Sequence, residues 1–126
     1  MIEYYVSKVI EVDANTTKKE IIVNGKDTRV LIVKEILMHF PTGSNYTLQV
    51  VFNAGLLTKI PVEGYFTGDN LLLPIKQDVV IEPNSKLEIN ITNTDASNSH
   101  KLEIIVKVVE LTEEEYEEYK KRGETL

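Results

Sequence analysis

Apolar and polar residues alternate along most of this chain, most regularly near its C-terminal end. In 87–92 every second residue is leucine or isoleucine, and after a polar loop at 93–100 the same period of two continues to 108. A period of two is typical of β-strands that bury one face. These two runs therefore predict antiparallel strands in an all-β domain.

Shorter apolar runs, separated by turn-forming residues, predict the remaining strands. They span 1–12, 20–23, 29–40, 46–53, 56–62 and 71–80. Turns at intervals of about 8–12 residues are expected of a β-sandwich or barrel. Asn24-Gly25 predicts a hairpin, because both central residues of a type I′ turn adopt positive φ. The adjacent charges Lys34 and Glu35 predict a bulge that lets both reach water, in a bent strand that passes between the sheets.

The C-terminal residues change from strand to helix periodicity. Thr112 and Glu115 have the spacing of a capping box, and Leu111 and Tyr116 the spacing of a hydrophobic staple. Acidic residues then precede basic ones, in the order that complements a helix dipole, and Gly123 falls where a helix stop is expected. We therefore expect a helix of about ten residues. The chain divides into a sandwich, 1–111, and a helix with tail, 112–126.

Composition restricts the classes of function. The 126 residues are 42% hydrophobic, enough for one domain with an ordinary core. The net charge of -6 argues against nucleic-acid binding, because an acidic surface repels phosphate. Cysteine is absent, which excludes disulfides, thiolate metal sites and a cysteine nucleophile. No signal-peptide-like or membrane-spanning apolar run occurs, so we expect synthesis in the cytoplasm and no membrane partner.

The sequence contains no pattern typical of an enzyme. His39 and His100 lack the spacing to further ligands that a metal site shows. No nucleophile elbow, P-loop or GxGxxG is present. The oxygen-rich loop 93–98 suits calcium or a turn, and we favour the turn. We therefore predict a non-enzymatic protein with no catalytic residue, metal or cofactor.

Two sets of residues are candidates for binding. Tyr46 and Phe52 are in register with a core face, so we expect them to be buried. An aromatic platform for sugars could therefore be presented only by the irregular loop 63–70. Its candidates for a glycan or other ligand are Tyr65, Phe66 and Asp69. Several apolar side chains lie instead on the polar side of a strand or on one helix side, which indicates coverage by the helix or by a partner subunit. The interface candidates are Val51, Ile105, Val109, Tyr116 and Tyr119.

Two segments carry a family resemblance. In 64–74 a glycine-containing loop leads to a short Leu-Pro strand, and in 81–93 a Pro-Asn-Ser-Lys-Leu turn leads to a strand that ends in Thr-Asn. This order resembles the small jelly-roll structural proteins of tailed bacteriophages and related viruses, of the decoration, cement, head-fibre and adhesin types. The resemblance implies a jelly-roll-like sandwich of about eight strands, here with a short C-terminal helix. It also implies a homo-oligomer, most often a trimer, with a capsid or other protein partner and association with a virion.

Overall fold

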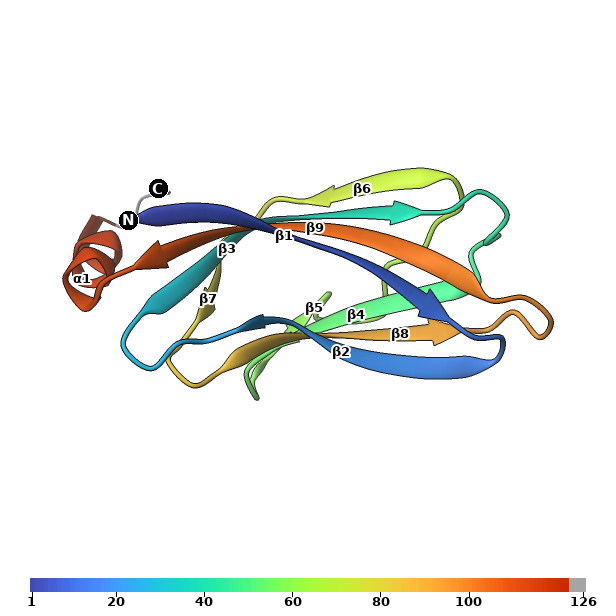
Figure 1. Cartoon of the computed structure of the whole chain (residues 1–126), viewed down its shortest axis with the longest axis horizontal. Coiled ribbons are helices and arrows are strands. Elements are labelled where there is room, and N and C mark those ends of the chain that lie inside the picture. Colours follow the sequence, from blue (N-terminus) through green and yellow to red (C-terminus); the bar gives the residue numbers. More distant parts are fainter. Residues whose placement is uncertain (123–126) are drawn as a thin grey trace.

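The computed structural model describes residues 1–122 and shows two antiparallel sheets packed face to face, followed by one helix (Figure 1). The strands are β1 Ile2–Val12, β2 Thr16–Asn24, β3 Val30–Phe40, β4 Leu48–Ala54, β5 Thr58–Ile60, β6 Leu71–Ile75, β7 Val79–Ile81, β8 Lys86–Asn93 and β9 His100–Leu111, and the helix α1 is Glu113–Arg122. Sheet A has the order β1-β9-β3-β6, with β7 also paired to β3, and sheet B has the order β2-β8-β4-β5.

The strand order is that of a jelly roll. Most consecutive strands belong to opposite sheets, so the chain winds around the core instead of forming a meander. The strands β6 and β7 pair with different halves of β3 and together occupy the place of one interrupted strand. The predicted all-β, jelly-roll-like sandwich with a C-terminal helix is confirmed.

The core lies between the sheets and follows the period-two pattern. Leu87, Ile89 and Ile91 of β8 are fully buried, as are Leu102 and Val106 of β9. The two strands lie in opposite sheets, so their apolar faces meet across the sandwich. Burying each such side chain contributes roughly 1.5–3 kcal/mol. The other strands add their own buried side chains to the same core.

The hairpin predicted at Asn24-Gly25 is wrong. The strand β2 pairs with β8, and β3 belongs to the other sheet. Gly25 is required for a different reason, because its N–H donates to the Ser85 carbonyl at 2.7 Å. A Cβ at position 25 would lie 2.6 Å from the carbonyl oxygens of Glu82 and Ser85. The glycine therefore allows a close approach of two backbones that are distant in sequence.

The predicted bulge in β3 is present, but its consequence differs from the expectation. The register with β9 shifts between Val33 and Glu35, and β3 stays within sheet A. Lys34 does not reach water freely, since its side chain is 9% exposed and its Nζ lies 2.6 Å from Asp78 Oδ1. This contact is an ion pair by distance, without a well-aligned hydrogen bond. The bulge keeps apolar side chains facing the core on both halves of a long strand.

Helix α1 begins with the predicted capping box. The Thr112 N–H donates to Glu115 Oε1 at 3.0 Å, and the Glu115 N–H donates to Thr112 Oγ1 at 3.2 Å. Tyr116 and Tyr119 pack on Ile32, Val109 and Leu111, so the helix docks on its own sandwich, beside the N-terminus (Figure 1). The predicted stop at Gly123 lies outside the described residues. Within 1–122, no helix has the length and apolarity to cross a membrane.

Candidate interaction surface

The two histidines lie in separate structural pairs. His39 Nδ1 is 3.9 Å from Glu103 Oε2 on the outer face of sheet A. His100 Nε2 is 2.9 Å from Asp95 Oδ2, in the loop between β8 and β9. Among residues 1–122, no group of three or more histidines and carboxylates is arranged to hold a metal ion.

The oxygen-rich loop 93–98 has the geometry of a turn, as predicted. Asp95 Oδ1 accepts the N–H groups of Ser97 and Asn98 at 2.9 and 3.1 Å. The Ser97 N–H, followed by the His100 side chain, lowers the pKa of Asp95 to about 2. The carboxylate is therefore committed to holding its own loop.

The three ligand candidates have different surroundings. Tyr65 is 50% exposed and accessible. Phe66 pairs with Val50 through two backbone hydrogen bonds and packs on the core. Asp69 Oδ1 accepts the N–H groups of Gly43 and Asn45 at 2.9 and 2.8 Å, and so holds a neighbouring loop.

Tyr46 is an aromatic residue that the periodicity placed wrongly. It precedes β4, has a φ of 62° and is 62% exposed, although its alternation with Phe52 put it on a core face. The positive φ turns the chain just before the strand begins, so the alternation does not extend back to this residue. Phe52 is fully buried, as that alternation indicates.

The interface candidates have different surroundings. Val109 is 3% exposed and lies beneath α1, whose Tyr116 and Tyr119 cover it. These three residues therefore pack against one another within the chain. Val51 is half-buried on the outer face of sheet B, opposite Asn90 of β8. Ile105 is 42% exposed on the outer face of sheet A, and it is the most accessible of the five.

The most exposed apolar residues, Leu56 and Leu57, were not predicted as a site. Sequence alternation assigned them to a strand at 56–62, but β5 begins at Thr58. Ala54 of β4 pairs with Thr58, so the two leucines lie in the connecting turn with Gly55, whose φ is 65°. Their exposures are 102% and 98%. The glycine was the available signal, because a turn that starts there includes the leucine pair.

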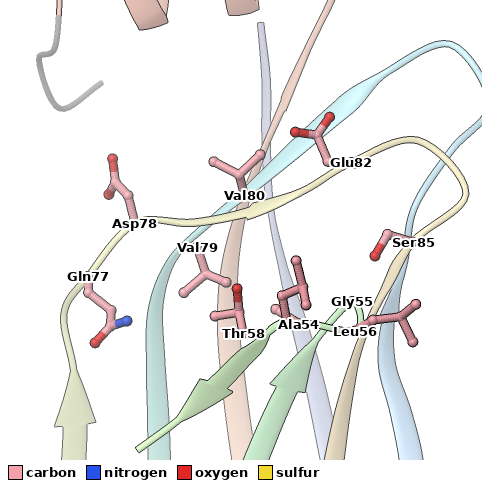
Figure 2. Close-up of a pocket in the computed structure, with 11 residues that line it drawn as sticks. Ala54, Gly55, Leu56, Thr58, Gln77, Asp78, Val79, Val80, Glu82 and Ser85 are labelled. Atoms are coloured by element: carbon pink, nitrogen blue, oxygen red, sulfur yellow. The ribbon is translucent and has the colours of Figure 1, made fainter. Parts of the chain in front are cut away.

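A cavity of about 630 Å³ lies between this turn and residues 77–82. Figure 2 shows two facing segments, with Ala54 and Leu56 on one and Asp78 and Glu82 on the other. Asp78 is occupied by Lys34 and by the Tyr119 hydroxyl, which donates to its Oδ2 at 2.7 Å. Burial and this hydrogen bond raise the pKa of Tyr119 to about 12. Asp78 therefore serves to hold α1 in place.

Exposed large apolar residues gather along two opposite edges of the sandwich. Strands β1 and β2 contact each other at one edge, and β5 and β6 end the two sheets at the other. In the described chain, the exposed large apolar residues other than Tyr46 and Ile105 belong to these edge strands or to the loops beside them, and Ile105 lies directly opposite Ser7 of β1. The β1/β2 edge comprises Met1, Ile2, Tyr5, Val9 and Ile21. The β5/β6 edge comprises Leu56, Leu57, Val62, Tyr65, Leu71 and Leu72.

No protein-family model and no curated protein matches the chain in sequence. Solved structures with a similar arrangement include the VP2 subviral particle of infectious bursal disease virus, at 13% identity and a TM-score of 0.48. That match covers 92% of this chain and 34% of VP2, so the chain spans about a third of that protein. The cyanophage Pam1 capsid matches at 15% identity and a TM-score of 0.40, covering 85% of this chain and 82% of that one.

A carbohydrate-binding module of family 16 also has a similar arrangement, at 13% identity and a TM-score of 0.36. The match covers 79% of this chain and 74% of the module. The jelly-roll assignment given above rests on the strand order of this chain itself.

Proposed function

We propose that this protein is a non-enzymatic structural component that acts through contacts between copies of itself and with another protein. In this proposal it serves in a virion, as decoration, cement or fibre-type proteins do, and a trimer is the favoured assembly. The complete exposure of Leu56 and Leu57 is the observation that carries the self-assembly. Its virion setting is supported by the resemblance of segments 64–74 and 81–93.

Exposure of this kind has a physical cost. Single apolar residues are common on protein surfaces, but contiguous apolar patches usually mark an interaction site. Leu56 and Leu57 are adjacent, and Val62 and Leu72 on the same edge are 83% and 58% exposed. Burying each leucine in a contact would contribute roughly 1.5–3 kcal/mol. An oligomer is therefore the favoured state of this chain.

The solution mass of the purified protein tests this proposal. Light scattering on a sizing column at two protein concentrations is expected to give one stable oligomer with the same mass at both. A monomer at both concentrations would contradict self-assembly.

The alternative is a glycan- or ligand-binding module that uses the loop 63–70. Phe66 and Asp69 contribute to the core and to a neighbouring loop, so Tyr65 is the residue left to contact a ligand. Titration with a panel of soluble oligosaccharides separates the two proposals. Saturable binding by a monomer that is abolished by Tyr65→Ala would favour the module.

A further inference from the structure

We propose that charged side chains on the core faces of β1 and β2, Lys8 above all, prevent these edge strands from pairing with strands of other chains. This inference goes beyond the proposed self-assembly and does not depend on it, because it concerns a contact that the chain prevents. The strand at the edge of a sheet has unpaired backbone groups, so an uncovered edge promotes aggregation.

The strand β1 is the edge with the greatest need for protection. It has eleven residues, pairs with β9 without a register shift and contains no proline. Tyr5 and Val9 on its outward face are 66% and 62% exposed. A long, regular edge strand with exposed apolar residues is a template for another strand. Some feature of the chain must therefore oppose strand addition here.

Lys8 lies on the core face of β1. Its register partner on β9 is Ile104, which is 1% exposed and part of the core. Val6 and Ile10, two positions away on either side, pack on the same core, so the half-buried lysine interrupts an apolar row. An inward-pointing charge on an edge strand opposes pairing, because an added strand would remove water from the ammonium.

The Lys8 ammonium reaches across to the other edge strand. Its Nζ donates to the Ile21 carbonyl of β2 at 3.0 Å. That carbonyl lies beside the register shift between Ile21 and Val23, where β2 bulges away from regular pairing with β8. A bulge is a second feature that makes an edge unsuitable for another strand.

The strand β2 repeats the arrangement with two charges. Lys18 and Glu20 are opposite Ile91 and Ile89 of β8, which are fully buried, so both charges lie on the core face. Lys18 Nζ donates to the Glu11 carbonyl of β1 at 3.2 Å and lies 3.7 Å from Glu20 Oε1. Two lysines thus cross between β1 and β2 in opposite directions, and each caps a backbone carbonyl.

The opposite side of the sandwich has different obstacles to strand pairing. The strand β5 has three residues and is followed by Pro61. The strand β6 contains Pro74, which has no N–H to donate. Short strands and prolines limit edge pairing without any charge. Because β1 and β2 have neither a proline nor a short length, their inward charges carry the protection.

The variant Lys8→Met with Lys18→Met tests the inference. It removes both ammonium groups but keeps unbranched side chains, and the urea midpoint verifies that it folds. Its mean mass by light scattering should rise several-fold with protein concentration and time, because the edges are now open to strand addition. The control is Lys19→Met with Lys101→Met. It removes the same charge from outward-facing positions and should keep the wild-type mass.

Two further substitutions separate edge protection from other roles. Adding Val6→Lys to the methionine variant returns a charge to the core face of β1 and should largely suppress the rise in mass. Adding Leu56→Ser with Leu57→Ser should leave the rise unchanged, since strand pairing does not use the exposed leucines. A folded methionine variant that keeps the wild-type mass at every concentration would overturn the inference.

Amide hydrogen exchange of β1 supplies a measurement on the natural chain, which holds even if the methionine variant fails to fold. Every second N–H of an edge strand points away from its only partner. These amides should exchange at the same rate in the wild type and in Leu56→Ser with Leu57→Ser. Slower exchange in a wild-type oligomer would show that β1 pairs between copies and would overturn the inference. A wild-type monomer would contradict self-assembly alone.

Discussion

The sandwich has two apolar regions outside its main core. One is buried by the chain itself, and the other is exposed. Ile32, Val109 and Leu111 on the outer side of sheet A, here called the α1 patch, are buried by the helix. Leu56 and Leu57 on the β5/β6 edge have no cover within residues 1–122. The comparison shows that the chain can cover an apolar surface with its own residues. The uncovered leucines therefore point to contact with another molecule.

The cover over the α1 patch depends on several contacts acting together. A helix of ten residues is too short to be stable alone in water. Besides its capping box, α1 is held by the Tyr119 hydrogen bond to Asp78 and by an ion pair of 2.7 Å between the Met1 ammonium and Glu115. Packing of Tyr116 and Tyr119 on the patch completes the attachment.

The largest expected loss of stability comes from a substitution in the buried region, the α1 patch. Ile32→Ala removes a fully buried side chain from the α1 patch and should destabilise the protein by about 3 kcal/mol. Ile105→Ala, on the same sheet but 42% exposed, is the matched control and should cost under about 0.5 kcal/mol. Urea unfolding at one fixed protein concentration measures both. Equal losses would show that the patch is not a second core.

Acid is expected to have a smaller effect, which reaches the helix through Glu115 and the loop 93–98 through Asp95. The hydrogen bond from the N-terminal ammonium, and then that from the Thr112 N–H, lower the pKa of Glu115 from 4.5 to about 2. Because the pKa is lower in the folded protein, the stabilisation is complete above pH 4.5 and is lost as the pH falls toward 2. Amide hydrogen exchange of α1 should therefore accelerate over that range. In Glu115→Gln, this acceleration should be much reduced.

The smallest effect on folding is expected at the exposed leucines. Leu56→Ser with Leu57→Ser should change the stability of the monomer by less than about 0.5 kcal/mol, because both side chains are already solvated. Ile60→Ser in the adjacent strand, at 5% exposure, should destabilise it markedly. Unfolding at several protein concentrations separates the folding of the monomer from assembly. A large loss from the leucine pair would mean that they support the fold itself.

Sequence periodicity predicted the architecture well where burial decides the structure. The alternation in β8 and β9 and the capping box of α1 depend on neighbouring residues, which a single sequence displays. Asn24-Gly25 was wrongly predicted as a hairpin, because Gly25 is needed where the chain passes close to the distant carbonyls of Glu82 and Ser85. Lys34 was misread because its partner, Asp78, is 44 positions away in the chain. Neither contact leaves a local signal.

The candidate surface was harder to predict than the fold. Ile105 could be found because it departs from a regular alternation. Leu56 and Leu57 resemble the start of a strand, and only the pairing of Ala54 with Thr58 places them in a turn. Whether an apolar residue is exposed depends on hairpin register, which a shift of one residue reverses.

The pairing of β1 with β9 also affects how the chain folds during synthesis. The N-terminal strand finds its neighbour in sheet A only after the last strand has been made, and β2 likewise waits for β8. Contacts between such distant segments slow folding, because a long loop must close before they form. A nascent chain thus carries β1 and β2 without their sheet partners through most of translation, and the apolar side chains of β1 stay uncovered during that time.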